Sequence, residues 1–428
     1  MKGKVSVLVF PCGAENGLEI YYSLKDCVNI TLFGASGKED HGSYVFRNYL
    51  GGLPNIADPG FIDYFTRILV ENEIDVVFPT HDDVALFLAA SASQLPAQII
   101  VPGLWQAEVC RSKKRTYQLF EGYPFTPKTF GSLVEATYPL FAKPDKGQGG
   151  KGAFLFESMQ VAERSCFNLE EYVLCEFLPG EEVTVDCFSD RHGALRFIGP
   201  RSRDRVFGGI SLRSTSIHPN EEISTIAQAI HDLIKPNGLW YFQAKQDEWG
   251  QFKLLEISVR ASGTMNLYRM KGINFPLLSL YNALGYDVEI APNSFSIQVD
   301  RALINRYRHN IIYHTVYIDF DDTITTAGEP NPEVVFLLYN LKKQGKQIIL
   351  ITRHAGNIYQ TLDRIALHKN LFLSIIQMKE GEEKYQQIKR EPAVFIDNIF
   401  RERWLVQHHI GIPVFDVDAA WALMDWRN

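Results

Sequence analysis

The strongest restriction on the fold comes from an apolar strand that ends in a cluster of carboxylates. Residues 316–323 read VYIDFDDT, so Asp319, Asp321 and Asp322 follow directly on an apolar run. Open α/β sheets bind ligands at the carboxyl ends of their strands, and clustered acids repel one another unless a cation or a reaction requires them. The alternative is a strand-to-helix turn in which Asp321 or Asp322 caps the helix. The segment therefore favours an α/β sheet with a site at this strand end.

The composition limits the class of protein. At 428 residues the chain exceeds the size at which single cores split, so two or three domains are expected. The net charge of -7 gives no electrostatic footprint for nucleic acid or an anionic membrane. No stretch approaches the ~20 apolar residues of a membrane span, and the first apolar run breaks at Pro11, unlike a signal peptide. The six cysteines lack metal spacing and indicate reduced thiols in a cytoplasmic protein.

The first hundred residues alternate between strand and helix patterns. We expect strands at 5–10, 30–33 and 75–78 and helices at 18–25 and 61–72. This alternation predicts a parallel, doubly wound sheet. The third strand leads into His81, Asp82 and Asp83, which either face a crevice or cap the next helix.

A glycine-rich and lysine-rich segment follows at 138–152, which reads YPLFAKPDKGQGGKG. Successive backbone N–H groups in such a loop can fold around phosphate oxygens, and lysines add positive charge. A bare turn would need the glycines but not the lysines. The segment therefore favours a loop that covers phosphates.

A hairpin is expected over residues 240–264, WYFQAKQDEWGQFKLLEISVRASGT. Gln243 and Glu256 fall near paired positions, and Arg260 follows the second strand. A chance arrangement of polar residues would not explain why Glu256 interrupts the apolar run at 254–257. These side chains therefore belong to a candidate site.

In their order and spacing, RSKKRTY, PLFAKPDKGQGGKG, VLCEFLPGEEVTVD and the hairpin resemble ATP-grasp enzymes of the carbamoyl-phosphate-synthase-like carboxylate–amine ligase branch. The resemblance covers about residues 1–300. It implies a Rossmann-like pre-ATP-grasp domain over 1–108 and an α+β ATP-grasp domain over 109–306. It also implies ATP and Mg²⁺, with Mn²⁺ as an alternative, and amide formation through an acyl phosphate.

The resemblance also implies roles for single residues of this sequence. The nucleotide would be held by Lys114, Lys143, Gly147, Gly149, Gly150, Gly152, Glu176, Phe177 and Glu182. Mg²⁺ would be held by Gln243 and Glu256, with Ser258 at the position where the family usually has Asn. Arg260 would stabilise the transferred phosphoryl group.

The segment RSRDRVFGGIS supplies a candidate region for the acceptor substrate. Its Arg203 and Arg205 have the planar forks that bind carboxylates in a bidentate way, and Arg201 precedes them. A solvated charged loop explains the same residues equally well.

The downstream motif Asp-x-Asp-x-Thr resembles motif one of the haloacid-dehalogenase (HAD) phosphohydrolases. A helical linker, RALINRYRH, would lead into a Rossmann-like domain over 307–428. The resemblance implies Asp319 as the nucleophile and Asp321 as the general acid and base. Thr352 would hydrogen-bond the phosphoryl oxygens, and Lys379 or more readily Lys384 would be the neutralising lysine. Asp319, Asp321 and Asp397 would bind Mg²⁺.

This downstream part departs from the usual family pattern at two places. Asp322 replaces a common Gly, and Asn398 stands where a second acid is usual, with Glu402 slightly beyond. The short intervals between Asp319, Thr352 and Lys384 leave no room for a cap domain. An open site of this kind would take a large substrate or use the neighbouring domain as a lid.

The sequence thus predicts a bifunctional cytoplasmic enzyme. Its substrates would be a small-molecule carboxylate, an amine and a phosphorylated metabolite, with neither nucleic acid nor membrane as partner and the oligomeric state open. Two alternatives remain: a phosphatase with a nucleotide-sensing ATP-grasp module, and a ligase with an inactive HAD interaction domain.

Overall fold

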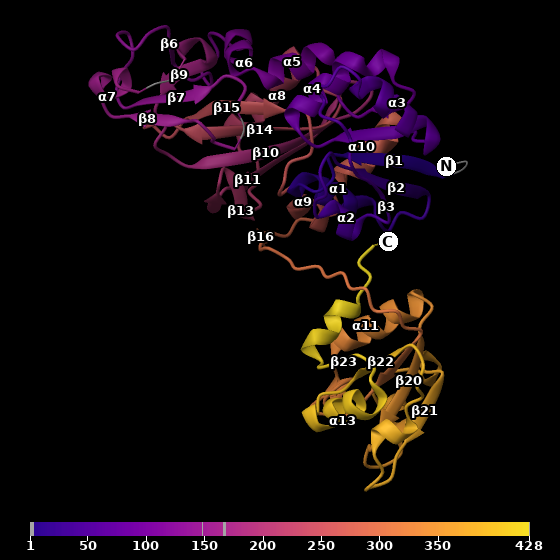
Figure 1. Cartoon of the computed structure of the whole chain (residues 1–428). Coiled ribbons are helices and arrows are strands. Elements are labelled where there is room, and N and C mark those ends of the chain that lie inside the picture. Colours follow the sequence, from indigo (N-terminus) through magenta and orange to yellow (C-terminus); the bar gives the residue numbers. More distant parts are fainter. Residues whose placement is uncertain (1–3, 148, 166–167, 428) are drawn as a thin grey trace. The chain divides into compact units, whose positions relative to one another are not determined.

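The computed structural model describes residues 4–147, 149–165 and 168–427 (Figure 1). The chain divides into two compact units, Met1–Leu303 (unit 1) and Ile304–Arg427 (unit 2). In the described ranges, no helix has both the length and the apolar character needed to cross a membrane.

The first sheet of unit 1 is parallel, with the strand order β3-β2-β1-β4-β5. Its strands are β1 (Val5–Phe10), β2 (Ile30–Ala35), β3 (Asn48–Leu50), β4 (Val76–Pro79) and β5 (Gln98–Ile99). Side chains alternate between two cores, so Val7 and Val9 lie in one and Leu8 and Phe10 in the other. This is the doubly wound pattern expected from the sequence.

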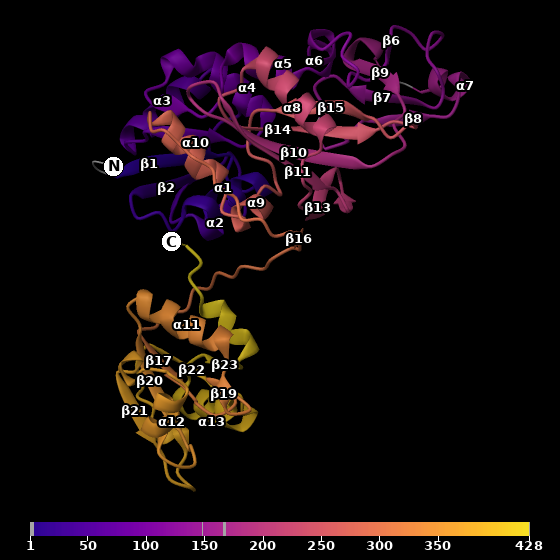
Figure 2. The same cartoon turned by 180° about the vertical axis from the view of Figure 1, so that it is seen from behind.

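Helices from distant parts of unit 1 cover this sheet. One core contains residues of α3 (Phe61–Glu71) and α4 (Asp82–Ser91). The other contains α1 (Glu15–Leu24) and α10 (Phe275–Ala283), which lie side by side (Figure 2). The amino-terminal sheet is therefore completed by a helix from the far end of the unit.

The remainder of unit 1 is built on antiparallel sheets. One sheet has the order β11-β10-β14-β15 and comprises β10 (Glu182–Ser189), β11 (Leu195–Ser202), β14 (Gly238–Gln246) and β15 (Phe252–Ser258). Its core includes the apolar side of α8 (Glu221–Ile234). The other sheets comprise β6 (Thr129–Phe130), β7 (Leu140–Pro144), β8 (Phe154–Phe156) and β9 (Tyr172–Glu176), and then β12 (Arg205–Phe207), β13 (Ile210–Thr215) and β16 (Gln298–Asp300).

The remaining helices of unit 1 are short: α2 (Gly42–Val45), α5 (Leu104–Arg111), α6 (Lys113–Leu119), α7 (Met159–Glu163) and α9 (Asn266–Met270). Ser112 separates α5 from α6, and its hydroxyl accepts a hydrogen bond from Arg115 N at 3.2 Å. A serine N-cap of this kind begins a new helix. The basic segment therefore starts its helix at Lys113, and this start sets the directions of the two lysines that follow Ser112.

Unit 2 contains a five-stranded parallel sheet of order β21-β20-β17-β22-β23. The strands are β17 (Thr315–Ile318), β20 (Gln347–Thr352), β21 (Ser374–Gln377), β22 (Ala393–Ile396) and β23 (Val414–Phe415). The helices are α11 (Pro332–Lys343), α12 (Ile358–Arg364) and α13 (Phe400–Ile410), and a small hairpin joins β18 (Thr325–Thr326) to β19 (Glu329–Pro330). Val316 and Ile318 pack into one core and Tyr317 into the other, so both faces of the sheet are covered.

The prediction of a helical linker at RALINRYRH was wrong. No helix or strand is assigned from residue 301 to 312, all of which the structure describes. Arg301 N donates to Leu212 O at 2.8 Å, which extends the pairing of β16 with β13. Helices shorter than ~12–15 residues are marginal without packing, and Leu303 in this segment is fully exposed.

Candidate functional site

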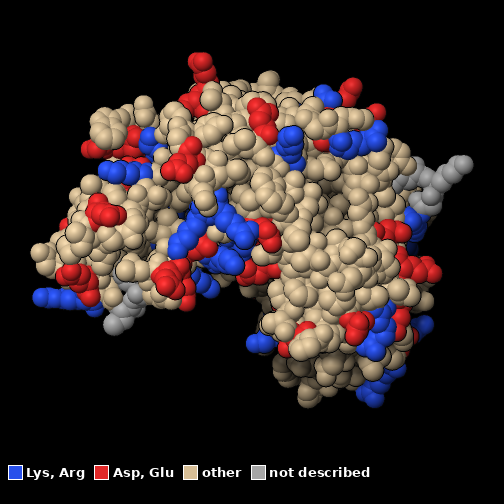
Figure 3. Space-filling view, turned by 90° about the horizontal axis from the view of Figure 1, so that it is seen from above, with Lys and Arg blue, Asp and Glu red and all other residues tan. Residues whose placement is uncertain are grey.

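Two adjoining cavities in unit 1 collect most of the polar residues that the sequence indicated. The first has a volume of about 230 Å³ and is lined by Lys113, Lys143, Lys151, Glu182, Arg203, Gln243 and Glu256 together with Gly147, Gly149 and Gly150. The second, of about 170 Å³, shares Gly149, Arg203, Gly209, Gln243 and Glu256 with it. Lys and Arg atoms gather in a hollow on the face shown in Figure 3.

A bulge in the hairpin fixes Lys143 in the first cavity. Gln243 pairs with Glu256 and Ala244 with Leu254, which leaves Leu255 without a partner. The carbonyl oxygen of Leu255 accepts from Tyr117 OH at 2.8 Å and from Lys143 Nζ at 3.3 Å, and Lys143 Nζ also donates to Tyr117 OH at 2.7 Å. Buried lysines need such oxygen partners, so the bulge orients this cation.

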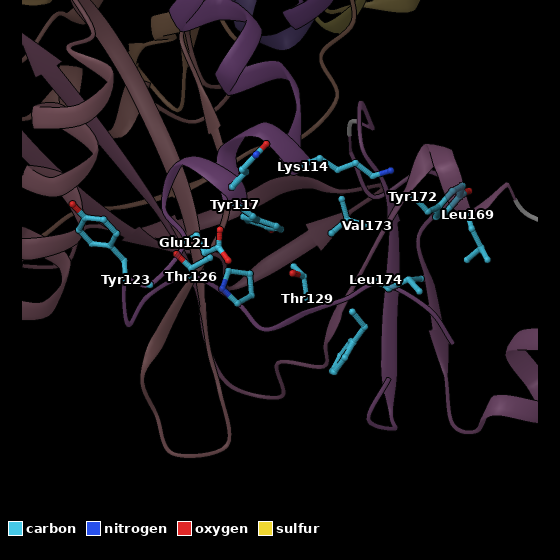
Figure 4. A pocket seen from close by; sticks show the side chains of 15 residues that line it. Lys114, Tyr117, Glu121, Tyr123, Thr126, Thr129, Leu169, Tyr172, Val173 and Leu174 are labelled. Atoms are coloured by element: carbon cyan, nitrogen blue, oxygen red, sulfur yellow. The ribbon is translucent and has the colours of Figure 1, made fainter. Parts of the chain in front are cut away.

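Lys113, rather than Lys114, is the second lysine of this cavity. Lys113 Nζ lies 3.7 Å from Glu256 Oε2 and donates to Gly147 O at 3.1 Å. Burial lowers the pKa of Lys113, and Glu256 partly opposes this effect. Lys114 instead lines a separate cavity of about 510 Å³ beside Tyr117 and Tyr172, where its Nζ donates to Glu170 O (Figure 4).

Gln243 and Glu256 are direct partners in the register of β14 and β15, and both line the first cavity. Ser258 lies apart from them, because its hydroxyl donates to Asp82 Oδ1 at 2.7 Å. Among the described residues, no group of three or more His, Cys, Asp or Glu side chains is arranged to hold a metal ion. Gln243 and Glu256 thus offer the cavity one amide and one carboxylate as oxygen ligands, whereas the other lining carboxylate, Glu182, pairs with Arg203.

Asp82 holds Arg260 at the second cavity. Arg260 Nη2 donates to Asp82 Oδ2 at 2.9 Å and Nη1 to Ala261 O at 2.9 Å, whereas Nε is buried without a partner in the described part of the chain. Burial would raise the pKa of Asp82, but the Arg260 guanidinium and its hydrogen bonds outweigh burial and hold this pKa below its usual value. Neither Asp82 nor Asp83 caps α4, since His81 is the N-cap residue.

The glycine-rich segment forms the loop between β7 and β8. Gly149, Gly150 and Gly152 have φ of 63°, 68° and 73°. The loop rests on the turn between β12 and β13, where a Cβ on Gly209 would lie 2.2 Å from Gly149 O. Only glycine permits this approach. Gln148, inside the loop, lies outside the described residues.

The predicted hinge residues occupy different surroundings. Glu176 Oε1 accepts from Lys128 N at 2.7 Å, and Lys245 Nζ lies 5.8 Å from the centroid of the Phe177 ring. Glu182 lines the first cavity and pairs with Arg203, with 2.7 Å between Oε1 and Nε.

The arginines of the predicted acceptor segment separate into three environments. Arg203 lines both cavities. Arg201 also reaches the second cavity, but its Nε donates to the buried Asp186 Oδ2 at 2.7 Å. Arg205 is half-exposed and pairs with Asp300 outside either cavity.

In unit 2, three neighbouring strands end at one cluster of side chains. Asp319 follows β17, Thr352 ends β20 and Asp397 follows β22, and all three side chains are buried. Lys384 Nζ donates to Asp319 Oδ1 and to Asp397 Oδ2, both at 2.6 Å. Lys384 is 2% exposed, whereas Lys379 is exposed, so the structure brings Lys384 to the cluster.

Burial and mutual repulsion govern the electrostatics of this cluster. Burial raises the pKa of Asp319 and of Asp397 above the usual carboxyl range, and Lys384 opposes the rise in both. One lysine therefore balances two buried carboxylates. An added cation would stabilise both as anions.

Asp321 points to a residue that the sequence analysis did not identify. Its Oδ1 lies 2.9 Å from His354 Nδ1, and the other ring nitrogen lies 2.8 Å from Thr361 Oγ1. His354 directly follows Thr352-Arg353, and that position at a strand end was the only signal for it. The Thr323 hydroxyl lies 3.3 Å from Asp319 Oδ2, and Glu402 pairs with Arg353 at 2.9 Å rather than with the cluster.

Comparison with known proteins identifies part of unit 1. A family model described as "ATP-grasp in the biosynthetic pathway with Ter operon" matches residues 168–302. Residues 168–302 are therefore similar to an ATP-grasp domain. The mixed α/β fold and the ATP-grasp resemblance predicted from the sequence are thereby confirmed. None of the curated proteins is significantly similar in sequence.

Solved structures share part of the fold of this chain at low identity. The L-amino acid ligase from Bacillus licheniformis is 19% identical, covers 66% of this chain and 75% of its own, and has a TM-score of 0.53. A second similar structure is the biotin carboxylase domain of Hydrogenobacter thermophilus 2-oxoglutarate carboxylase in complex with MgADP, ADP and bicarbonate. It is 15% identical, the match covers 68% of this chain and 72% of that domain's chain, and the TM-score is 0.57. Staphylococcus aureus N5-carboxyaminoimidazole synthetase with ADP is 13% identical. The match covers 68% of this chain and 80% of the synthetase chain, and the TM-score is 0.55.

Proposed function

We propose that the protein combines an ATP-dependent carboxylate–amine ligase in residues 1–306 with a Mg²⁺-dependent HAD-type phosphatase in residues 307–428. The observation that carries the ligase proposal is the convergence of Lys113, Lys143, Gln243 and Glu256 on one cavity beneath a glycine-rich loop. A cavity with lysines, backbone N–H groups and two oxygen ligands is suited to a nucleoside triphosphate with its metal ion. The ADP-bound neighbours with the same fold support this proposal.

Each residue of the ligase site has a proposed task. Lys113 and Lys143 neutralise phosphate oxygens, and the loop from Gly147 to Gly152 closes over them. Gln243 and Glu256 would hold Mg²⁺, which when bound draws charge from the phosphate oxygens. Arg260, with its unpartnered Nε, stabilises negative charge on the group in transfer.

The proposed ligation proceeds in two balanced steps. A carboxylate oxygen of the acceptor attacks the γ-phosphorus of ATP, and the bond to the bridging oxygen breaks as ADP leaves with the electron pair. The amine nitrogen then attacks the acyl carbon of the resulting acyl phosphate. Phosphate departs with its electron pair, and the amine loses a proton to solvent as the amide forms.

The phosphatase proposal depends on the cluster at the ends of β17, β20 and β22. Asp319 attacks the phosphorus and Asp321 protonates the departing ester oxygen, which leaves an aspartyl-phosphate. Asp321 then takes a proton from water, whose oxygen attacks phosphorus and frees Asp319. Thr352 and Lys384 bind phosphoryl oxygens, and Asp319 and Asp397 fit a Mg²⁺ ion because two buried carboxylates share only one lysine.

The ligase proposal is tested by screening metabolite carboxylates and amines for ADP release with the full chain. Lys143→Ala and Glu256→Gln should each abolish acceptor-dependent ADP formation, since they remove phosphate charge and a metal ligand. Hydrolysis of an aryl phosphate by the same variants should stay at the parent rate. Full ADP formation by Glu256→Gln would refute the proposed metal position.

A further inference from the structure

The second cavity of unit 1 lies where parallel sheets bind ligands. In the order β3-β2-β1-β4-β5, the chain runs from β1 to one side and later returns to the other, so the order reverses between β1 and β4. Residues that follow these two strands line the cavity: Pro11, Ala14, Glu15 and Asn16 after β1, and Thr80 and His81 after β4. Asn16 Nδ2 donates to Thr80 O, which ties the two strand ends together. The crevice at such a reversal is the usual ligand position in open α/β sheets.

Four arginines line this cavity, and three of them have a carboxylate partner. Arg201 pairs with Asp186 at 2.7 Å, Arg203 with Glu182 at 2.7 Å and Arg260 with Asp82 at 2.9 Å. Arg301 has no ion pair within 4.0 Å among the described residues. Burial lowers the pKa of Arg301, and the nearby carboxylates of Glu15 and Glu19 oppose this effect without forming an ion pair. Its guanidinium therefore has no direct carboxylate partner within the part of the chain that the structure describes, and it is the cation of this cavity available to an anion from solution.

The backbone fixes Arg301 in this position. Arg301 N donates to Leu212 O at 2.8 Å, and its carbonyl accepts from Arg205 Nη2 at 3.3 Å. Its Nη1 is buried without a hydrogen-bond partner in the described structure and lies 3.1 Å from where a Cβ on Gly263 would be. A buried guanidinium nitrogen without an acceptor is costly, and an oxyanion would supply the acceptor.

The start of α1 adds a second attraction for anions. The N-cap residue of this ten-residue helix is Ala14, whose side chain cannot accept from the first N–H groups. These groups and the helix dipole favour a negative group, and the Glu15 carboxylate in the first turn supplies part of this negative charge at the same cavity wall. Arg301 and this helix end line the part of the second cavity that is not shared with the first cavity.

We propose that the acceptor of the ligase carries two oxyanions. Its reactive carboxylate lies beside Arg260 and Glu256, and a second carboxylate or phosphoryl group binds Arg301 at the start of α1. The identification of this ligand as the acceptor rests on the proposed ligase function, whereas anion binding at Arg301 does not depend on that function. A volume of about 170 Å³ equals that of roughly six water molecules, which restricts the occupant to a small metabolite.

Calorimetric titration of the full chain, saturated with Mg²⁺ and a non-hydrolysable ATP analogue, tests this site. Inorganic phosphate and succinate are the two probes, and they distinguish a phosphoryl from a carboxylate preference. Arg301→Gln should weaken at least one probe by about tenfold or more, as expected for a lost charge-assisted contact. Arg301→Lys should retain part of the affinity.

The matched control is Arg213→Gln, which removes a half-exposed arginine on β13 that pairs with Asp300 outside the cavity. It should bind both probes like the parent. The proposal would be overturned if a folded Arg301→Gln variant bound both probes as tightly as the parent. It would also be overturned if the parent bound neither probe. Because no turnover is measured, this outcome is distinct from a failure of the ligase proposal, which the ADP assay reports.

Discussion

The two proposed phosphate sites differ in the sign of the charge that predominates in them. In unit 1, the first cavity is lined by the cations Lys113, Lys143, Lys151 and Arg203 and by two carboxylates, Glu182 and Glu256. In unit 2, Lys384 alone contacts both Asp319 and Asp397. Fixed cations stabilise a phosphoryl group that passes between two substrates, whereas buried carboxylates supply a nucleophile and ligands for a cation. The charge balance thus distinguishes the proposed transfer site from the proposed hydrolysis site.

The largest effect is expected from Asp319→Asn in unit 2. The amide keeps the shape of the side chain but loses the attacking carboxylate, so aryl phosphate hydrolysis should fall by about 10³-fold or more. Initial rates of phosphate release measure this. Asp322→Asn, at the neighbouring exposed position, is the control and should hydrolyse at a rate close to that of the parent. Hydrolysis at the parent rate by Asp319→Asn would contradict the assignment of Asp319 as the nucleophile, and with it the contrast between the two sites.

The next effect separates two adjacent lysines of α6. Lys113→Ala should lower acceptor-dependent ADP formation by about 10²-fold, because Lys113 reaches the cavity beside Glu256. Lys114→Ala should change it by less than about threefold, because Lys114 faces another cavity. Steady-state ADP formation decides the matter, and a larger loss in Lys114→Ala would reverse the assignment.

A smaller effect is expected from Asp82→Asn, which tests how unit 1 positions its transfer arginine. The variant weakens the contact to Arg260 Nη2, so kcat should fall by about tenfold to 10²-fold with little change in the KM for ATP. Ser258→Ala should act in the same direction but more weakly. A parallel rise in the KM for ATP without a change in kcat would contradict this positioning role.

The smallest predicted effect concerns the acceptor. Arg203→Gln should raise the KM for the carboxylate by about tenfold, since Arg203 lines both cavities. Arg205→Gln should leave that KM within about twofold, since Arg205 pairs with Asp300 at the surface. Equal effects of the two variants would return this segment to a solvated charged loop.

The sequence predicted those features that depend on local pattern. The local pattern predicted Asp319 at a strand end, and the resemblance placed Thr352 and Asp397 in the same site. All three lie at the carboxyl ends of neighbouring strands in one sheet. The pairing of Gln243 with Glu256 followed in the same way from the two strands of a short hairpin.

Features that depend on distant contacts were not predictable. Asp82 meets Arg260 only because α4 packs near the end of β15, and no local pattern reports that contact. The choice between Lys113 and Lys114 depended on the helix break at Ser112. The expected helix at 301–309 failed because pairing at Arg301 N extends the sheet edge instead.

The most direct test of the account measures both activities in one preparation of the full chain. ADP release with an acceptor found by screening and phosphate release from an aryl phosphate are compared in the parent, Glu256→Gln and Asp319→Asn. If the two sites are separate, Glu256→Gln should lose only ADP release and Asp319→Asn should lose only aryl phosphate hydrolysis. Loss of both activities in either folded variant, or of neither, would contradict two separate phosphate sites in this chain.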